Sequence, residues 1–421
     1  MPSIDKRQSR YTLIVLVVIV LFGYLLLHDL SGGTLLQHNA WDSYTLQALS
    51  WREGRLDLGQ DYSYLEIAQY EGKYYCSFPP VPTLVMLPLT YIFGANTPNN
   101  IVVMLYAIIA AVLIYKSLLL AFMRPTSAAL LAALAVFGSN AMWMSTIGGV
   151  WFQAQLLNLV LLSGAFYCAL KNRRFAAYVL VAFAVGCRPF SLLAFPVLFT
   201  AFAMKDYNAS GAKGTKQFLC VAITQWKYLI APAIIGIAYM MFNYARFDNV
   251  FEFGHNYLPE FIEAENGQFS LTYIPTNLYN ILLRFVGFKE NLQLDYPIFD
   301  GFCFIIANPI FVFCIIRLIT DIIKKRMEPV RIVTNVCMLI MLLFLCAHKT
   351  FGGWQFGARY TVDMIPLGIF FLAWGAKDMI DDIPRSYQGE SSWILRPADR
   401  VVCMLGIIFN IYGTLALNLA G

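Results

Sequence analysis

The sequence predicts an all-α polytopic membrane protein, and three observations support this fold class. Of the 421 residues, 59% are apolar and only 13% are charged, whereas a soluble domain carries about 25% charged residues. The mean hydropathy is +0.62. The apolar residues also come in repeated blocks close to the roughly 20 residues that a helix needs to cross a bilayer. This composition excludes a disordered chain, a secreted disulfide scaffold and a soluble cytosolic enzyme.

The first span is expected at residues 11–30 and is retained, because no small-residue cleavage site follows it. Basic residues precede this block and place its start in the cytoplasm. Further spans are expected at residues 101–121, 127–145, 150–170, 228–244, 301–320, 331–347, 360–377 and 401–420, with a split pair at 175–187 and 190–204. The total is about eleven transmembrane helices, within a range of 10–13.

Residues 80–94 are apolar but short, and they contain three prolines. If this segment crossed the membrane, the basic clusters at 171–174 and 324–326 would both lie outside. If it re-enters or lies at the interface, nearly every basic cluster lies inside, so the positive-inside rule favours a non-spanning, re-entrant hairpin.

We therefore expect one membrane-embedded domain that covers residues 1–421. The first outer loop, residues 31–100, follows the first span and ends in the re-entrant hairpin. A helix bundle at 101–244, a second outer loop at 245–300 and a C-terminal bundle at 301–421 complete the chain.

The first outer loop begins with a candidate catalytic residue. Trp41, Tyr44, Ala48 and Trp51 share one face of a predicted surface helix, and Asp42 lies in its first turn. An acidic residue at a helix start caps free N–H groups. A carboxylate at the mouth of a membrane cavity can also take a proton from a hydroxyl. The two roles are compatible.

Two arginines near the outer face are candidate anion-binding groups. Arg359 precedes a late span, and Arg188 lies at the break of the split helix pair. A guanidinium at membrane depth is costly unless it has a partner, and its N–H groups match phosphate oxygens. The alternative for each arginine is a side chain that extends to the interface as an anchor.

Other features of the outer loops offer fewer specific signals. The second outer loop carries Glu252 and His255 in a Phe-rich stretch, and these are candidates for a lid or an acceptor platform, unless the stretch is a packed interfacial strand. Tyr74 and Tyr75 in the segment GKYY are candidates of the same kind. The nine cysteines and four histidines are dispersed, and no Asp-x-Asp pair occurs in the outer loops. The sequence thus indicates no metal ligand and no cofactor, although it leaves dependence on a divalent metal open.

Six segments, taken in order, resemble the GT-C superfamily of membrane glycosyltransferases. The nearest branch contains bacterial enzymes related to protein mannosyltransferases and the lipid A aminoarabinose transferase. The segments are WDSYTLQALSWREGRLDL, GKYYCSFPPVPTLVMLPLTYIFG, STIGGVWFQAQ, CRPFSLLAFP, NYARFDNVFEFG and WQFGARYTVDMIPL. Each motif is weak alone, and their order makes the resemblance specific.

The resemblance implies a polyprenyl-phosphate sugar donor, Asp42 as the base and Arg359 as a donor phosphate ligand. Arg188 is a further candidate for that phosphate, from its place at the break of the split helix pair. Relatives carry a lysine before the paired prolines where this chain has Phe78, so Lys73 is the candidate replacement. Relatives also carry a second acidic residue in the next outer loop. The candidates for that role here are Asp61 and Glu66.

From these features we expect an inverting glycosyltransferase in the plasma (inner) membrane, with a cytoplasmic N-terminus and an extracytoplasmic active site. Its partners would be a polyprenyl-phosphate sugar, membrane lipid and a glycan, glycolipid or protein acceptor, but no nucleic acid. Two alternatives stay open. One is a transporter or flippase of a lipid-linked sugar, although no repeated halves are visible. The other is a non-catalytic assembly partner.

Overall fold

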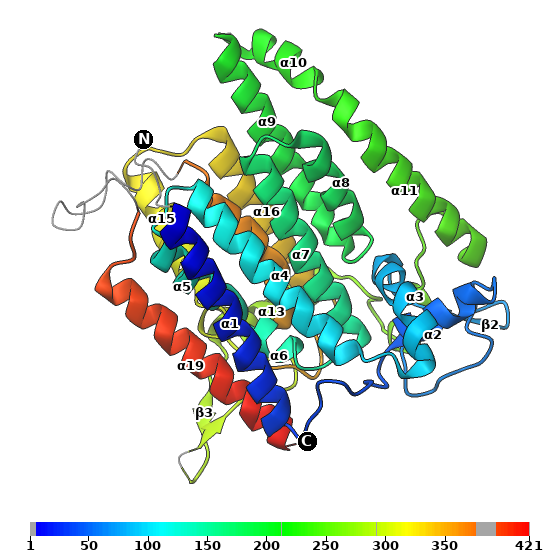
Figure 1. Cartoon of the computed structure of the whole chain (residues 1–421). Coiled ribbons are helices and arrows are strands. Elements are labelled where there is room, and N and C mark those ends of the chain that lie inside the picture. The colour runs from blue at the N-terminus through cyan, green and yellow to red at the C-terminus, as the bar shows by residue number, and fades with distance from the viewer. Residues whose placement is uncertain (1–5, 212, 292, 376–392, 421) are drawn as a thin grey trace.

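The computed structural model describes residues 6–211, 213–291, 293–375 and 393–420, and helices make up most of it (Figure 1). Among these residues, seven helical segments are long and apolar enough to cross a membrane. They are α1 (Lys6–Leu30), α4 (Asn99–Leu120), α7 (Val150–Leu170), η2 with α9 (Pro189–Leu193 and Ala194–Ser210), α11 (Trp226–Phe247), α16 (Pro329–Cys346) and α19 (Pro397–Ala420). The prediction of a multi-pass helical membrane protein is confirmed, and the total of eleven spans stays a prediction.

Shorter apolar helices fill the space between the long ones. These are α3 (Val81–Phe93), α5 (Pro125–Phe137), α8 (Arg174–Val185), α15 (Ile310–Ile323) and α17 (Ile365–Ala373), which follows η5 (Arg359–Met364). The span expected at 360–377 corresponds to η5 and α17, and its last two residues lie outside the described residues. The predicted break of the split pair is present, since α8 ends at Gly186 and Pro189 begins η2.

Helices α4 and α7 form the centre of the bundle. Helix α7 contacts α8 and α17 as well as α4, and α1 packs beside α4 and α5 (Figure 1). The rings of Phe166 on α7 and Phe370 on α17 stack with their centroids 4.6 Å apart. Core side chains of this size, packed from several helices, fix the bundle that supports the loops.

The first outer loop folds against the end of this bundle. Helix α2 (Ser43–Arg52) is followed by an antiparallel hairpin of β1 (Ile67–Tyr70) and β2 (Lys73–Cys76). Glu71 and Gly72, the two residues of its turn, both have positive φ, at 48° and 74°. Such two-residue turns match the twist of the flanking strands.

Residues 80–94 form one short helix, α3, rather than the two-armed hairpin expected from the sequence. Its 13 residues span about 20 Å, less than a bilayer core. The backbone N–H of Val81 donates to the carbonyl oxygen of Gly186 at 3.0 Å. This bond joins the start of α3 to the break between α8 and η2.

The second outer loop contains several short elements and a second hairpin. They are η3 (His255–Tyr257), α12 (Pro259–Ile262), η4 (Leu271–Tyr273), α13 (Ile274–Leu283), β3 (Gly287–Phe288) and β4 (Leu294–Asp295). The remaining short elements of the chain are η1 (Gly94–Asn96), α6 (Ala141–Met144), α10 (Thr215–Ile223) and α14 (Phe304–Ala307).

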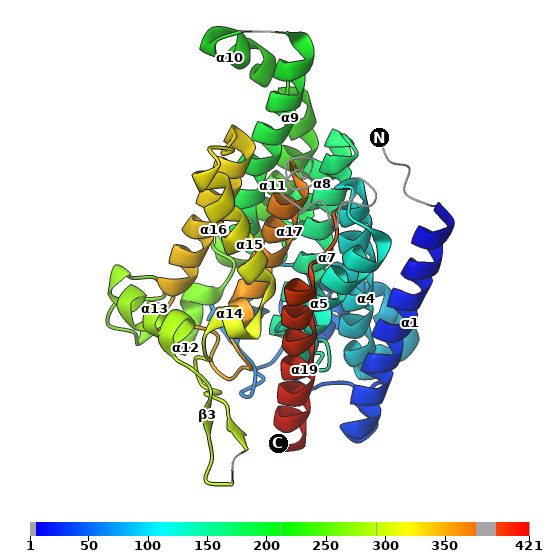
Figure 2. The ribbon, with the colours of Figure 1, turned by 90° about the vertical axis from the view of Figure 1, so that its left-hand side faces the viewer.

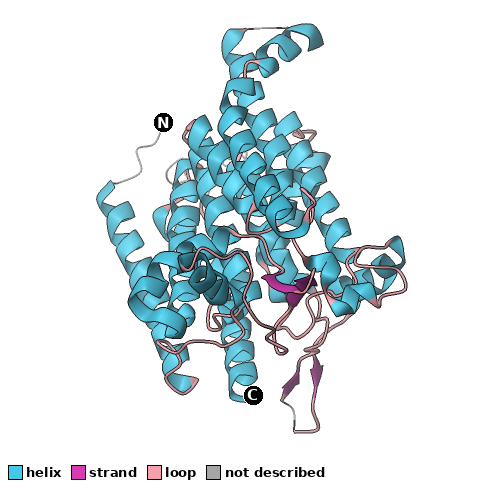
Figure 3. Ribbon diagram, turned by 90° about the vertical axis from the view of Figure 1, so that its right-hand side faces the viewer, coloured by secondary structure: helices cyan, strands magenta, loops and turns pink. Residues whose placement is uncertain are grey.

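The two ends of the bundle differ in what they carry. Both hairpins, α2, α12 and the end of α19 lie at one end, which we call the loop end (Figures 2 and 3). The start of α1 and helix α10 lie at the opposite end (Figure 2). The outer loops predicted from the sequence therefore gather at one end of the bundle.

Candidate functional site

A cavity of about 900 Å³ lies at the loop end. Its wall combines the first outer loop, the turn before α7, the second outer loop and the loop at 348–358. The charged and imidazole side chains in this wall are Glu66, Arg188, His255, Glu260, His348, Arg359 and His38. Aromatic side chains fill much of the remaining wall and include Trp41, Trp143, Trp151, Trp354 and Tyr360.

A glycine-rich loop brings Arg359 to the cavity. The carbonyl oxygen of Gly352 accepts from Nε and Nη2 of Arg359, at 3.1 and 3.0 Å. Gly357 has a φ of +69°, and a Cβ atom there would lie 2.0 Å from the side-chain nitrogen of Asn140. Only glycine fits this position, because the backbone conformation is left-handed and the neighbouring helix is in contact.

Gln155 on α7 holds the other side of the Arg359 guanidinium. Its Oε1 accepts from Nη1 of Arg359 at 3.0 Å, and its Nε2 donates to the Arg359 carbonyl oxygen at 3.2 Å. A guanidinium has five N–H groups, and these contacts use three of them. One N–H on each terminal nitrogen therefore stays available for a ligand in the cavity.

Arg188 lies at the break between α8 and η2, as predicted, and it is paired. Its Nε donates to Oδ2 of Asp363 at 2.9 Å, while Asn158 donates to Oδ1 at 3.1 Å. The Asp363 side chain is only 2% exposed. A buried carboxylate of this kind holds the guanidinium in place, since either charge alone would be costly to bury.

The two arginines meet at Tyr360. The Cζ atoms of Arg188 and Arg359 lie 4.9 and 4.7 Å from the centroid of its ring. Asp363 balances one of the two positive charges, and in the described residues Arg359 forms no ion pair with a carboxylate. Arg188, Arg359 and Asp363 together therefore carry a net positive charge at the cavity wall, which favours an anionic ligand.

Asp42 caps α2, which is one of the two roles predicted for it from the sequence. Its Oδ1 accepts from the backbone N–H groups of Tyr44 and Thr45, at 3.0 and 3.2 Å. Its Oδ2 accepts from the Thr45 hydroxyl at 2.6 Å and from the Asn99 side chain at 2.8 Å. Burial raises the pKa of this carboxyl, and the bonds from Thr45 and Asn99 act in the opposite direction.

The Asp42 carboxylate does not line the cavity, although Trp41 beside it does. The Trp41 carbonyl oxygen accepts from the N–H of Val150 at 2.7 Å, which ties the loop to the start of α7. Arg359 thus lines the cavity, whereas the first outer loop contributes Trp41 and not the neighbouring Asp42 at this point of the wall. The catalytic role of Asp42 stays a prediction.

Glu66 is the carboxylate of the first outer loop that lines the cavity. Burial raises its pKa to about 7, and the negative charge of Glu260 acts in the same direction. Interaction with the Trp151 side chain and the positive charge of Arg359 lower it. A carboxyl group with this pKa is deprotonated in a large fraction of molecules at neutral pH and can accept a proton.

His255 presents a fixed hydrogen-bond acceptor to the cavity. Its Nδ1 lies 2.6 Å from the carbonyl oxygen of Ser77, so Nδ1 carries the hydrogen and Nε2 carries the lone pair. Burial lowers the pKa of His255 to about 4, and the ring stays neutral at neutral pH. The rings of Phe78 and Phe261 pack on it, with centroids 5.0 and 6.0 Å away.

The sequence reasoning missed three ionisable groups of the wall, His38, His348 and Glu260. Burial lowers the pKa of His348 to about 4 and raises that of Glu260. The Lys349 side chain donates to the Glu260 carbonyl oxygen at 2.6 Å, which links their loops. The available signal was the glycine-rich stretch after His348, because such loops approach ligands closely.

The other predicted site residues lie away from the cavity wall. Lys73 and Asp61 are exposed, and Tyr75 packs on Phe247 at the end of α11. Tyr74, half-buried in β2, also lies outside the wall. The placement of Lys73 in the structure therefore gives no support to its predicted role as a phosphate ligand.

Glu252 is buried and bonded to its own loop. Its carboxylate accepts from the backbone N–H of Gly254 and from the Asn256 side chain, both at 2.6 Å. It does not line the cavity. Glu252 thus shapes the turn that carries His255 instead of facing an acceptor.

The last helix closes one side of the cavity. Leu417 and Asn418 of α19 are part of its wall. The Asn418 side chain donates to the hydroxyl oxygens of Thr146 and Ser31, at 3.1 and 3.3 Å. Helix α19 is therefore joined to both the first outer loop and the turn before α7.

A second, apolar slot of about 490 Å³ lies between α8, α9 and α11. Apolar and aromatic residues line it throughout. Val185 and Leu192, which line the slot, flank the break that carries Arg188. Gly236 of α11 also lines it, and a Cβ atom at Gly236 would meet nothing within 4 Å.

In the described parts of the chain, no group of three or more His, Cys, Asp or Glu side chains is placed to hold a metal ion.

The fold of this chain is similar to that of a solved archaeal oligosaccharyltransferase. Among solved structures, the chain is similar to the archaeal oligosaccharyltransferase AglB from Archaeoglobus fulgidus, in complex with an inhibitory peptide and a dolichol-phosphate. The TM-score is 0.58 at 13% identity, and the match covers 97% of this chain and 56% of AglB. The apo oligosaccharyltransferase gives a TM-score of 0.56 at 13% identity, over 99% of this chain and 56% of that one.

ArnT from Cupriavidus metallidurans bound to undecaprenyl phosphate matches with a TM-score of 0.48 at 13% identity, over 90% of this chain and 61% of ArnT. No family model and no curated protein matches the sequence. The chain thus spans little more than half the length of the oligosaccharyltransferase. The resemblance to the GT-C superfamily stated from the sequence motifs is confirmed for the fold.

Proposed function

We propose that this protein is a membrane glycosyltransferase that moves a sugar from a polyprenyl-phosphate donor to an acceptor hydroxyl. The observation that carries the proposal is the juxtaposition of Arg359, Arg188 and Glu66 in one cavity wall. Cations for a phosphate and a carboxylate for a hydroxyl proton are the two groups that this reaction requires. The fold shared with AglB supports the same chemistry.

In this proposal the donor phosphate binds at Tyr360 between the two guanidinium groups. The free N–H groups of Arg359 donate to the phosphate oxygens, and Arg188, which contacts the same tyrosine ring, adds a second positive charge. Both arginines are held by protein partners before a ligand arrives, so little reorganisation is needed as charge develops on the leaving phosphate.

The polyprenyl chain of the donor would lie in the apolar slot beside α11. The slot has no charged lining residue and ends at the break that carries Arg188. A lipid phosphate held by Arg188 can then leave its tail among apolar side chains. Entry from the side, between α11 and α9, would leave the rest of the chain in the bilayer.

We propose Glu66 as the proton acceptor, because its carboxylate lines the cavity and its pKa is about 7. Asp42, the base predicted from the sequence, is the second candidate. It would have to exchange at least one of its four hydrogen bonds to reach a substrate, and catalytic hydrogen bonds do change when a substrate binds. In the assignment proposed here, Asp42 fixes the position of Trp41 and the rim of the cavity.

The reaction then balances as a single displacement. The acceptor hydroxyl transfers its proton to the carboxylate while its oxygen forms a bond to the anomeric carbon. The bond between that carbon and the phosphate oxygen breaks, and the electron pair leaves with polyprenyl phosphate. In-line attack inverts the anomeric centre. A neutral His255 can accept a hydrogen bond from a second hydroxyl of the acceptor and orient it.

A reconstituted assay tests this function. The purified chain in proteoliposomes is first titrated with undecaprenyl phosphate and dolichyl phosphate, and then given a panel of radiolabelled polyprenyl-phosphate sugars with glycan, glycolipid and peptide acceptors. Transfer of label to an acceptor, with release of polyprenyl phosphate, supports the proposal. Movement of intact donor between leaflets without transfer supports a flippase instead. Binding without transfer or movement supports an assembly partner.

A further inference from the structure

Helix α10 exposes apolar side chains that no part of the described chain covers. It lies at the tip of the bundle opposite the loop end, beyond the neighbouring helices (Figures 1 and 2). Leu219 and Ile223 are 61% and 70% exposed, and Trp226 at the start of α11 is 63% exposed. Leu219 and Ile223 are four residues apart and share one face of α10, and Trp226 follows them at the start of α11.

This apolar face leads directly into a span. Along α11, Ile230, Ile234 and Ile237 are also exposed, and only 11% of the most apolar part of this helix is buried. A membrane that covers α11 therefore reaches Trp226. Helix α10, which immediately precedes it, is then at the level of the lipid headgroups, where tryptophan is enriched.

Basic residues accompany the apolar face. Lys213, Lys216 and Lys227 are exposed, and within the described ranges no carboxylate pairs with them. Asp206 is the one acidic residue between residues 205 and 227. Its carboxylate is held by Arg174 and by the Gln225 side chain and also attracts Lys227, so it offsets only part of the basic charge.

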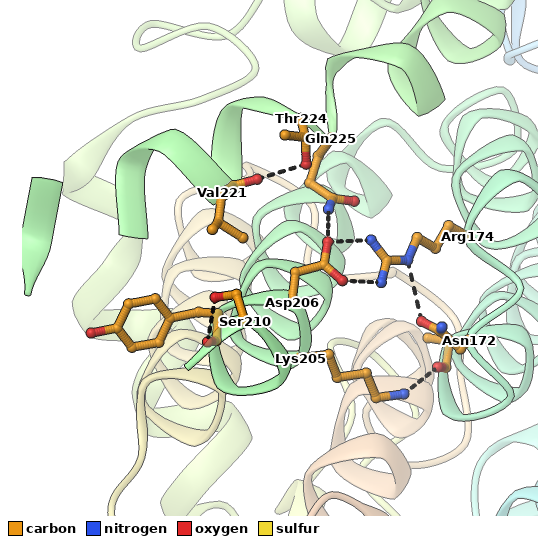
Figure 4. A network of polar contacts seen from close by, with 10 residues as sticks. Asn172, Arg174, Lys205, Asp206, Ser210, Val221, Thr224 and Gln225 are labelled. Atoms are coloured by element: carbon orange, nitrogen blue, oxygen red, sulfur yellow. Dashed lines mark hydrogen bonds and ion pairs between the residues drawn. The ribbon is translucent and has the colours of Figure 1, made fainter. Parts of the chain in front are cut away.

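A polar network holds α10 in this orientation (Figure 4). Asp206 of α9 lies between Arg174 of α8 and Gln225, which connects α10 to α11, and the bond from Gln225 is 2.7 Å long. On the other side, the Tyr207 hydroxyl oxygen accepts from the N–H of Gly214 at 2.8 Å. The helix is fixed at both ends, so its apolar face is held outward.

We propose that α10 lies on the membrane surface at this end of the bundle, with its apolar face inserted and its lysines on anionic lipid headgroups. Lys216 precedes Leu219 by three residues and so lies on the same side of α10, where its long side chain can reach the headgroups while the apolar side chains insert. Buried apolar area and electrostatic attraction then act together in binding the surface. Three exposed lysines close to exposed Leu, Ile and Trp side chains match anionic lipid better than zwitterionic lipid.

Cys220 provides a reporter in the native sequence. It is exposed, whereas the other cysteines in the described chain are buried or half-buried. It follows Lys216 by four residues and so lies on the same side of α10. The full chain is labelled there with an environment-sensitive fluorophore and placed in nanodiscs of phosphatidylcholine, with or without phosphatidylglycerol. A Cys220→Ser variant measures the label on other sites.

The expected result is a blue-shifted emission that is quenched by lipids spin-labelled near the headgroup. Both the shift and the quenching should be larger in nanodiscs that contain phosphatidylglycerol. The triple variant Lys213→Gln, Lys216→Gln and Lys227→Gln should lose this dependence on anionic lipid. Lys289→Gln, at the exposed hairpin of the loop end, should retain it. Emission like that in water in both nanodiscs, or an unchanged lipid dependence in the triple variant, overturns the proposal.

Discussion

Gln155 and Arg359, which are 204 residues apart in the sequence, bond to each other twice, through the guanidinium and through the backbone carbonyl. The amide of Gln155 can do both because its oxygen accepts and its nitrogen donates. The pair joins the central helix α7 to the loop that precedes α17. The pair therefore fixes the Arg359 guanidinium to the most buried part of the bundle.

Replacing Arg359 by Gln should weaken the binding of polyprenyl phosphate. A hydrogen bond to a charged group contributes about 1.5–3 kcal/mol, so loss of one or two should weaken binding about 10- to 10⁴-fold. Titration calorimetry in detergent measures the change. Arg55→Gln is the matched control, because Arg55 is exposed and paired with Glu53 at the same end of the molecule. Unchanged affinity in Arg359→Gln would remove this residue from the phosphate site.

Replacing Glu66 by Gln should lower the transfer rate by about 10²- to 10⁴-fold, the usual contribution of a general base. In the native chain, kcat/KM should rise with pH and level off above about 7, because Glu66 must be deprotonated and its pKa is about 7. The variant should lose that rise. A native pH profile that persists in Glu66→Gln would show that another group takes the proton.

Changes at Asp42 separate its capping role from catalysis. Asp42→Ala removes the cap of α2 and should cost about 1 kcal/mol of stability, whereas Asn is nearly as good a cap as Asp. Thermal unfolding of both variants measures this difference. If Glu66 is the base, Asp42→Asn should keep the native pH dependence. Folded Asp42→Asn protein without activity, beside an active Glu66→Gln variant, would return the role of base to Asp42.

The ion pair of Arg188 and Asp363 should be sensitive to removal of either partner alone. Arg188→Gln leaves a nearly buried carboxylate with only Asn158 as a donor, and breaking a buried pair costs about 3–5 kcal/mol. The double variant with Asp363→Asn should recover much of that stability, as measured by thermal unfolding in detergent. It should not recover affinity for polyprenyl phosphate. Recovery of affinity would show that Arg188 acts only through the fold.

A bulky residue at Gly236 should block the apolar slot. Because a Cβ atom there meets nothing within 4 Å, Gly236→Trp can fold and fill the space. The KM for a long-chain polyprenyl-phosphate sugar should increase, while that for a short-chain donor should not change. Ile237→Trp is the control, since Ile237 is 55% exposed on the same helix. Equal effects on both donors would place the lipid tail elsewhere.

The sequence predicted the helices well because hydropathy reports burial in lipid and protein alike. The start of α2 at Asp42 and the break before Pro189 followed from local rules, since capping residues and proline act on their immediate neighbours. The shape of residues 80–94 did not follow. One helix of 13 residues accommodates Pro82 in its first turn and Pro88 inside. The hairpin was inferred from the positions of the basic clusters along the chain, and these do not report the local backbone geometry.

The composition of the cavity was less predictable than the fold. Arg188 and Arg359 were selected because charge near a membrane needs a partner. The partner of Arg188, Asp363, lies 175 residues away, and no local rule connects them. Lys73 was chosen as the replacement for the lysine that relatives carry at the position of Phe78, yet it flanks the two-residue turn at the exposed tip of a hairpin. Glu66 precedes β1 without any helical or strand pattern, so only the folded chain reveals which way it faces.

The contact of Asn418 with Thr146 and Ser31 has a practical consequence for handling the protein. A purification tag fused after α19 would emerge beside the cavity and compete with substrates for the space around it. A tag placed ahead of α1 would emerge at the opposite end of the bundle. Antibody fragments or fusion partners intended to enlarge the particle for imaging are therefore better attached on the N-terminal side.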